Sequence, residues 1–273
     1  MSLLQSRLQD WKSRLFLVYG RRPYARGYRS YRRIQLHDYI HKSLPEGKLS
    51  DGWGRWLEER VVEYPWFFSR LPGTPGRLLD AGSVLNYGDV LSHERLRNKE
   101  ISIFTLAPES ECYWHRGISY VYGDLRNCCF RDDYFDWVVS LSTLEHVGMD
   151  NTRFYTHDHS KKECDPTSHL QAVLELRRVL KPNGALYVSL PFGRPRNYGW
   201  LQVFDLAAVR NILDVFQPAS SREIYFRYSA ASGWQLSSPD ECADARYFDP
   251  SQSQVDQGEV IAAEAVVCLE LLK

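Results

Sequence analysis

Between Leu78 and Phe192 the chain alternates short apolar runs with longer amphipathic segments. The run that begins at Phe135 is almost continuously apolar, as expected of a strand buried on both faces. Residues 168–184 instead place apolar side chains at every third or fourth position and end in Pro-Asn-Gly, which predicts a helix and its stop. This alternation is typical of a doubly wound α/β sheet of parallel strands. The predicted strands are 78–79, 100–107, 118–125, 135–147 and 185–192.

Residues 1–75 form a basic, aromatic-rich lead-in. Leucines and Trp11 recur at near-helical spacing in the first turns, which predicts a short amphipathic helix. Residues 56–71 are a second helical candidate, which we expect to be interrupted near Pro65 because proline lacks a backbone N–H. The pattern therefore divides the chain into a helical appendage, 1–75, and a sheet domain, 76–273.

The last quarter of the chain continues the alternation. Residues 204–216 predict an amphipathic helix, and 222–229 and 258–273 are strand-like. A long insertion separates the two strand-like runs, and loops of this length are often lids or binding elements. Its aromatic residues, which we expect to cover a substrate, are Trp234, Tyr247 and Phe248.

Composition indicates an ordinary globular protein, with 44% hydrophobic and 25% charged residues. No apolar run approaches the roughly 20 residues that span a bilayer, and the N-terminus does not resemble a secretory signal. None of the six cysteines forms a C-x-x-C pair, and their spacing predicts no disulfide framework. We therefore expect a reduced, cytoplasmic protein.

The formal net charge is zero but unevenly distributed. Residues 1–50 carry eight more basic than acidic side chains, and the remainder carries the opposite excess. Arginines and tyrosines interleave from Tyr19 to Arg33. This arm could contact nucleic acid, lie on an acidic membrane, or pair with the acidic body. We expect it to dock near the substrate mouth or the acidic body and not to bind nucleic acid specifically. Tyr24, Tyr28 and Tyr31 share one helical face, which would serve for packing.

The segment GRLLDAGSVLNYGDV, which begins at Gly76, passes from an apolar strand into a sharp turn. A strand that ends in such a turn is typical of a cofactor loop in a Rossmann-like sheet, where ligands bind beyond the carboxyl ends of the strands. Glycines usual in such loops are replaced here by Val84 and Asn86. Valine adopts a positive φ only at a cost, so we expect the turn to be rebuilt with different residues.

Three segments carry a more specific resemblance. They are LLDAGS, YGDLRNCCFRDDYFDWVVSLSTLEHV and ELRRVLKPNGALYVSLPFG, which together cover roughly residues 76–195. In this order and spacing they resemble class I S-adenosylmethionine-dependent methyltransferases, and EYPW before the first strand resembles bacterial members of largely unknown substrate. The resemblance implies a Rossmann-like seven-stranded sheet that ends in an antiparallel strand pair.

The same resemblance assigns roles to residues at the strand ends. An acid at Asp80 would accept from the cofactor's ammonium group, and Gly82 would let the backbone approach the methionine part. Asp124 would accept from the adenine amino group, with Leu125 contacting the ring. The alternatives are that Asp80 caps a loop and that Asp124 forms a turn. The implied S-adenosylmethionine-binding residues are Asp80, Ala81, Gly82, Ser83, Thr105, Asp124, Leu125, Ser140 and Leu141.

Thr105 departs from the family, which usually places at this position an acid that holds both ribose hydroxyls. A hydroxyl offers a weaker bond than a carboxylate, and Glu109 could compensate from the next turn. His146 and Glu145 are the candidate catalytic bases. Residues 156–169 are rich in His, Asp and Cys, but their spacing matches no standard metal site, and we expect no metal.

The acceptor stays open at this level. A small molecule or a saccharide is the first hypothesis, and nucleic acid held by the Tyr19–Arg33 arm is the second. A non-catalytic binding or scaffold protein that retains the fold is the third, with Thr105 and Val84 as the features that favour it. No Asn-Pro-Pro-Tyr type motif follows the fourth strand, which counts against methylation of exocyclic base amines.

Overall fold

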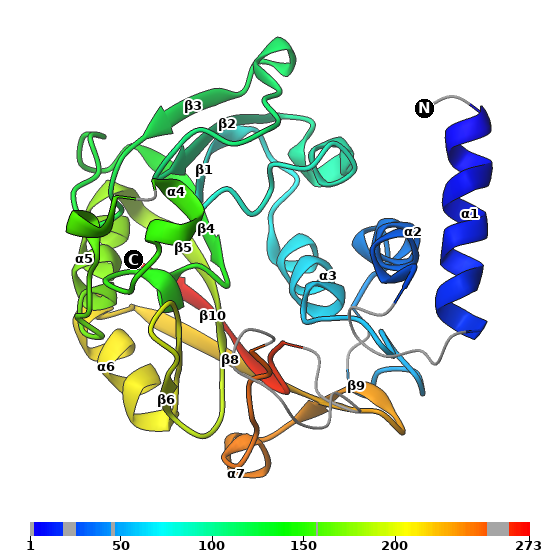
Figure 1. Cartoon of the computed structure of the whole chain (residues 1–273). Helices are drawn as coiled ribbons and strands as arrows, with labels where there is room; N and C mark the ends of the chain where they lie inside the picture. Colours follow the sequence, from blue (N-terminus) through cyan, green and yellow to red (C-terminus); the bar gives the residue numbers. More distant parts are fainter. Residues whose placement is uncertain (1–2, 19–25, 45–46, 157, 250–261) are drawn as a thin grey trace.

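The computed structural model describes residues 3–18, 26–44, 47–156, 158–249 and 262–273, with only the backbone of residues 3–10 (Figure 1). Within these residues one sheet of eight strands has the order β3-β2-β1-β4-β5-β10-β8-β9. The pairs among the first five strands are parallel, whereas β10, β8 and β9 pair antiparallel with their neighbours. Rossmann-like topology with an antiparallel C-terminal end is therefore confirmed. The strands are β1 (Gly76–Ala81), β2 (Lys99–Thr105), β3 (Ser119–Tyr122), β4 (Phe135–Leu141), β5 (Leu180–Pro191), β8 (Ser220–Ser229), β9 (Gly233–Ser237) and β10 (Ala265–Leu272), and β6 (Arg196–Asn197) and β7 (Gln202–Val203) form a separate pair.

The predicted count of seven strands is wrong by one. The additional strand is β9, which lies inside the predicted insertion and pairs with β8 at the sheet edge. Gly233 begins it with a φ of 71°, and its added Cβ would lie 2.3 Å from the carbonyl oxygen of Trp53. Trp234 does not cover a substrate, because it is fully buried and its indole N–H donates to the Leu57 carbonyl over 2.9 Å.

Helices cover both faces of the sheet (Figure 1). Neighbouring residues of β1 show the two-sided burial, since Leu78 packs in the cluster with α3 and Leu79 packs in the cluster with α5 and α6. Helices α1 and α2 stand beyond α3, each packed on the next. The helices are α1 (Leu3–Val18), α2 (Tyr28–Ile40), α3 (Arg60–Arg70), α4 (Thr152–Tyr155), α5 (His169–Val179), α6 (Leu206–Phe216) and α7 (Pro239–Cys242).

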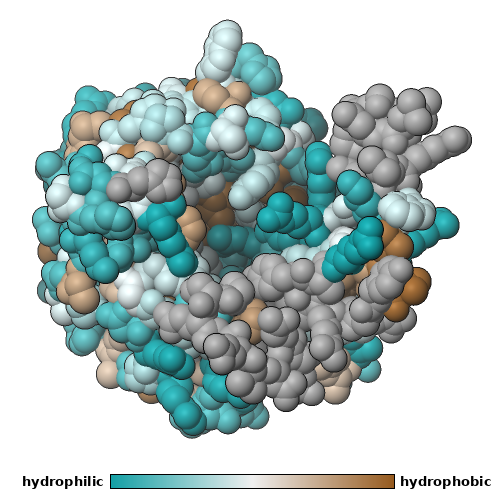
Figure 2. Space-filling view, viewed as in Figure 1, coloured by the Kyte–Doolittle hydropathy of each residue, from teal (hydrophilic) through white to brown (hydrophobic). Residues whose placement is uncertain are grey.

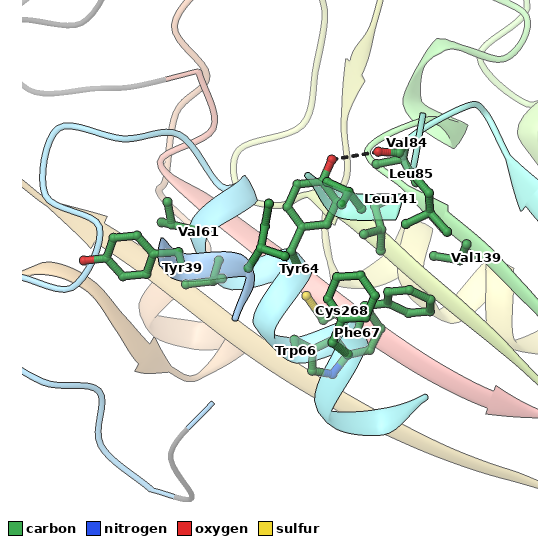
Figure 3. Close-up of a cluster of buried hydrophobic side chains, with 14 of the residues drawn as sticks. Tyr39, Val61, Tyr64, Trp66, Phe67, Val84, Leu85, Val139, Leu141 and Cys268 are labelled. Atoms are coloured by element: carbon green, nitrogen blue, oxygen red, sulfur yellow. Dashed lines mark hydrogen bonds between the residues drawn. The ribbon is translucent and has the colours of Figure 1, made fainter. Parts of the chain in front are cut away.

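The segment between β1 and β2 packs against α3, which precedes β1 in the chain. Residues 82–98 contain two 3₁₀ turns, Val90–Ser92 and Glu94–Leu96, and no α-helix. The hydroxyl of Tyr64 in α3 donates to the carbonyl of Val84 over 2.7 Å. Figure 3 shows this hydrogen bond as a dashed line, with Trp66 and Phe67 below Tyr64 in the view. The helical lead-in thus supplies part of the core beside β1, although the division at residue 75 itself stays a prediction.

Pro65 does not interrupt α3, contrary to the sequence expectation. A proline leaves the carbonyl four residues earlier without its helical N–H donor. Here that carbonyl belongs to Val61, and it accepts instead from the indole N–H of Trp53 over 2.9 Å. A tryptophan outside the helix therefore supplies the hydrogen bond that Pro65 cannot make.

The lead-in helices match the sequence patterns only in part. Helix α1 is present, but Trp11 is 55% exposed and Phe16 is the fully buried residue on the described part of the helix. Tyr28 and Tyr31 of α2 are buried as predicted, whereas Tyr24 lies outside the described residues. No described helix is both long and apolar enough to cross a membrane.

Candidate functional site

The turn after β1 is rebuilt without the usual glycines. Its positive φ values fall on Gly82, at 118°, and Ser83, at 65°. Val84 and Asn86 do not adopt positive φ, so neither residue carries the strain expected for a valine in a glycine position. A working loop geometry is therefore compatible with this sequence.

The side chain of Asp80 stabilises that turn through two hydrogen bonds. Its two carboxylate oxygens accept the backbone N–H groups of Val84, over 3.0 Å, and Leu85, over 2.8 Å. The side chain is fully buried, and burial raises its pKa to about 7 despite these two hydrogen bonds. This is the loop-capping alternative from the sequence, and direct contact of Asp80 with a cofactor stays a prediction.

A cavity of about 840 Å³ lies where the first four strands of the chain end. The order of the sheet reverses between β1 and β4, and ligands of doubly wound sheets bind at such a reversal. Figure 2 shows a hollow near the centre of the face that is in view. Predicted site residues that line the cavity are Gly82, Thr105, Asp124, Leu125 and His146.

The other predicted site residues lie behind the cavity wall. They are buried and do not line it, and the Ser83 and Ser140 hydroxyls have no hydrogen-bond partner among the described residues. Their direct contact with a ligand therefore stays a prediction, and their observed contribution is to the strand ends beneath the loops. These residues are Asp80, Ala81, Ser83, Ser140, Leu141 and Glu145.

Asp124 is held by an arginine that the sequence analysis did not consider. The Arg126 guanidinium donates to both Asp124 oxygens and, over 2.6 Å, to Glu163 from the loop before α5. Burial raises the pKa of Asp124, but the hydrogen bonds and charge of Arg126 lower it by more, so the pKa is lowered overall. Asp124 is therefore a fixed carboxylate, and Arg126 lines the cavity beside it.

Thr105 ends β2 at the cavity and is 5% exposed. Glu109, the residue considered as its compensation, lies in the following turn and accepts from the Asn86 amide over 3.1 Å. The second donor bond of that amide goes to the Glu111 carbonyl. Asn86 thus ties the turns after β1 and β2 together, which gives this position a packing role in place of the missing glycine.

His146 is the candidate base with access to the cavity. Its Nδ1 lies 2.9 Å from the Trp200 carbonyl, which can only accept, so we assign the proton to Nδ1 and a lone pair to Nε2. Burial lowers the pKa of His146 to about 4, so the ring is neutral at physiological pH. Its Nε2 lies 4.0 Å from Glu145 Oε1. Burial raises the pKa of Glu145 well above its usual range, which favours the neutral acid.

Under the ends of β4 and β5 lies a buried ion pair from α3. Glu63 is fully buried and accepts from Arg60 Nη1 over 2.5 Å, from the Ser142 hydroxyl over 2.6 Å and from the Ser189 hydroxyl over 2.5 Å. Arg60 also donates to the Leu141 carbonyl over 3.3 Å. Because Ser142 lines the cavity, this network connects the lead-in directly to the site.

Sequence reasoning missed Arg126, Arg60 and Glu63. The position of Arg126 two residues after Asp124 was the available signal, since an arginine there can fold back on the acid. Arg60 and Glu63, three residues apart on a helix, match an ordinary surface ion pair in sequence. Nothing in the neighbouring sequence distinguishes a buried Arg60–Glu63 pair from an exposed one.

The outer rim of the cavity is aromatic. Tyr155 of α4 lines it, and the neighbouring Phe154 is 55% exposed. The Arg153 guanidinium lies 4.4 Å from the ring centre of Trp200, which stacks on His146 at a centroid distance of 5.2 Å. In the described part of residues 156–169, and in the other described residues, no cluster of three or more His, Cys, Asp or Glu could hold a metal. His157 lies outside that part.

Comparison with known families gives one match. Residues 101–188 match the family model described as "Methyltransferase domain", which covers the segment from β2 to most of β5. Among curated proteins, no relative matches this sequence.

Solved structures give more distant similarities. A Burkholderia thailandensis 1,6-didemethyltoxoflavin-N1-methyltransferase, with bound 1,6-didemethyltoxoflavin and S-adenosylhomocysteine, is 13% identical. The match covers 74% of this chain and 72% of that one, with a TM-score of 0.44. A Thermotoga maritima protein described as a possible histamine N-methyltransferase is 15% identical, with 76% and 86% covered and a TM-score of 0.41. The [4+2]-cyclase SpnF is 17% identical, with 70% of each chain covered and a TM-score of 0.45.

Proposed function

We propose that this chain, whose residues 101–188 match a methyltransferase domain, is a class I S-adenosylmethionine-dependent methyltransferase that transfers a methyl group to a small-molecule or saccharide acceptor. The observation that carries the proposal is the cavity at the reversal of the sheet, lined by the loops that follow β1, β2, β3 and β4. Its volume of about 840 Å³ lies within the range of small-molecule sites, roughly 300–1,000 Å³. This is room for a cofactor and a small acceptor.

The cofactor would lie along the ends of β1, β2 and β3. Gly82 and Ser83 present the turn whose backbone would approach the methionine part. Thr105 would offer one hydroxyl to the ribose, and Asp124 a fixed carboxylate to the adenine amino group. Leu125, which is 8% exposed, would give the ring an apolar contact. The donor and acceptor types present therefore fit the cofactor.

A bound S-adenosylmethionine supplies an electrophilic methyl group on a sulfonium, so the protein must mainly align an acceptor and exclude water. His146 has its Nε2 lone pair available and its ring orientation fixed by the Trp200 carbonyl. It would accept a proton from an acceptor hydroxyl or amine. Glu145, buried behind it, is a positioning residue for the ring.

The acceptor side is supported by the aromatic rim. Tyr155 and Phe154 offer flat apolar faces with exposed edges, which suit a sugar ring or a planar small molecule. Charges of both signs, from Arg126, Lys162 and Glu163, also line this side. The rim therefore supports a compact polar acceptor with an apolar face.

Calorimetric titration with S-adenosylmethionine and S-adenosylhomocysteine tests the proposal. We expect one site per chain for both compounds. Absence of binding by either compound would overturn the proposal and favour a scaffold protein. A transfer assay with tritiated S-adenosylmethionine against glycans, small metabolites and RNA then separates the acceptor classes.

Removal of the carboxylate at Asp124 is expected to weaken S-adenosylhomocysteine binding. A hydrogen bond to a charged group contributes about 1.5–3 kcal/mol, so Asp124→Ala should raise Kd roughly tenfold or more. The matched control is Asp132→Ala, which removes another arginine-paired carboxylate, 2.6 Å from Arg178 on the exposed surface. Equal Kd values for the two variants would show that the cofactor does not reach Asp124.

The pH dependence of stability reports on His146. Its pKa is about 4 in the folded chain and about 6.5 when unfolded, so the unfolded state binds more protons between these values. Stability from this group is therefore complete above pH 6.5 and is lost as the pH falls towards 4. Its side chain is 30% exposed, so we expect acidification to lower the free energy of unfolding by about 1–2 kcal/mol through this group, which is less than the full pKa shift would give.

The measurement is the free energy of unfolding in urea at pH 7.5 and pH 5. His146→Gln should lose less stability on acidification than the parent chain, whereas His115→Gln, on the exposed surface, should behave like the parent. An unchanged pH dependence in His146→Gln would mean that the ring is not held neutral by burial.

A further inference from the structure

A second, basic surface lies far from the cavity, on α1 and the start of α2. A groove of about 440 Å³ runs between these elements. It brings Trp11, Lys12 and Leu15 of α1 together with Arg26 and Arg29. The name α1–α2 basic face is used below for these three cations together with four exposed residues around them, Arg14, Leu17, Val18 and Arg33.

The described residues do not neutralise the cations of this face. Lys12, Arg14, Arg26, Arg29 and Arg33 are exposed, and none has an ion-pair partner among the described residues. Arg32 is different, because it points towards the body and pairs with Glu58. Among the described residues of this face and its surroundings, Arg32 is thus paired, and the other five cations are exposed.

Apolar side chains are exposed on the same face. Trp11 is 55% exposed and Val18 is 78% exposed, and with Arg14 they occupy positions i, i+3 and i+7 of one helix side. Leu17 beside them is 39% exposed. Figure 2 shows hydrophobic residues next to hydrophilic ones over the C-terminal end of α1. Tryptophan and aliphatic residues among cations are the combination found where proteins lie on lipid headgroups.

The tyrosines of the arm argue against RNA as the partner. Binding of single strands relies on aromatic rings that stack on bases. Tyr28 is 3% exposed and Tyr31 is 9% exposed, and both pack on Phe16, with Tyr31 at a ring-centre distance of 4.7 Å. The described arm therefore offers cations and aliphatic groups outwards but keeps these two rings inside.

The groove has a fixed shape. Gly27 adopts a φ of 88°, and a Cβ at this position would lie 2.2 Å from the Lys12 carbonyl oxygen. This close approach and the packing of Phe16 fix the distance between α1, which carries Lys12, and the segment that carries Arg26 and Arg29. Lys12 is thereby held opposite Arg26 and Arg29, where all three could share one phosphate.

We propose that the α1–α2 basic face docks the enzyme on a membrane surface rich in anionic phospholipids, with headgroup phosphates in the groove and Trp11 and Val18 at the depth of the glycerol backbone. The uneven charge of the chain orients this contact, because residues 51–273 carry an acidic excess of eight and are repelled by the same surface. The proposal does not depend on the identity of the acceptor.

Flotation of the full chain with vesicles tests the proposal. Vesicles of phosphatidylcholine with 30 mol% phosphatidylglycerol should carry the protein, and pure phosphatidylcholine vesicles should carry far less. Each basic residue near such a surface contributes roughly 1 kcal/mol, so the triple variant Lys12→Ala, Arg26→Ala, Arg29→Ala should partition roughly a hundredfold more weakly. Trp11→Ala should weaken partitioning onto the vesicles several-fold and leave the thermal midpoint of unfolding close to that of the parent.

The matched control replaces three exposed cations of the body, Arg97→Ala, Arg194→Ala and Arg222→Ala, and should float like the parent. No flotation of the parent, equal flotation on neutral vesicles, or equal losses in the two triple variants would overturn the proposal. Tight, salt-sensitive binding of a single-stranded RNA that the groove variant abolishes, without flotation, would assign the face to nucleic acid instead. S-adenosylhomocysteine titration of the groove variant should match the parent, which separates this result from failure of the proposed function.

Discussion

Glu63→Ala is expected to lower the free energy of unfolding by about 3–5 kcal/mol, because it leaves the charge of Arg60 without its carboxylate. Glu63 is fully buried and accepts one hydrogen bond from Arg60 and one each from two serines. Burial alone would lower the pKa of Arg60, but the nearby acidic groups, Glu63 first among them, together raise it by more, so the arginine stays charged. The free energy of unfolding of a native protein is roughly 5–15 kcal/mol, so this loss would be a large fraction of the total stability.

Urea unfolding followed by tryptophan fluorescence measures this loss. The control is Glu100→Ala, which breaks a pair with Arg77 at 3.1 Å, whose glutamate side chain is 77% exposed. An exposed pair contributes about 0–1 kcal/mol. Similar losses in the two variants would show that the Arg60–Glu63 pair is solvated.

A double variant keeps the test informative if Glu63→Ala does not fold. Arg60→Met with Glu63→Leu removes both charges at similar volume, and it should be more stable than Glu63→Ala alone. A double variant as unstable as the single one would mean that the two serines, and not the arginine, depend on the carboxylate.

The sheet was predictable because its strands depend on local apolar runs. The run from Phe135 and the helix that ends near Pro182 both carry their signal in adjacent residues. β9 was missed because Gly233 and Trp234 resemble a loop until β8 is placed beside them. Pro65 was misjudged because its substitute donor, Trp53, lies twelve residues earlier and outside the helix.

The site was predictable in position but not in the direction of its side chains. Strand ends fixed where Asp80, Gly82 and Asp124 would lie, because parallel strands meet at one edge. Whether Asp80 faces the cavity or its own loop depends on the N–H groups of Val84 and Leu85, which sequence does not orient. Long-range partners are harder still, since Glu63 meets hydroxyls 79 and 126 residues away.

Gly82→Ala is the second change expected to have a large effect. The residue has a φ of 118°, a region that residues with a side chain rarely adopt, and an added Cβ would lie 2.3 Å from both Cγ2 and Oγ1 of Thr143. Backbone strain of this kind costs about 1–3 kcal/mol, and overpacking typically costs another 1–3 kcal/mol. Because Gly82 lines the cavity, we expect both a lower unfolding free energy and weaker S-adenosylhomocysteine binding.

Two further variants separate the causes. Gly117→Ala also places a side chain at a positive φ, 77°, but has no atom within 4 Å of the new Cβ, so it should cost only the backbone strain. Gly82→Ala combined with Thr143→Gly removes the clash and keeps the strain, so its stability should return towards that of Gly117→Ala. If the double variant is no more stable than Gly82→Ala, contact with Thr143 is not what requires a glycine at the end of β1. If S-adenosylhomocysteine binding by the double variant recovers together with its stability, Gly82 is needed for the packing of its loop against the loop of Thr143. If binding stays weak although stability recovers, Gly82 is needed for the approach of the ligand to the backbone.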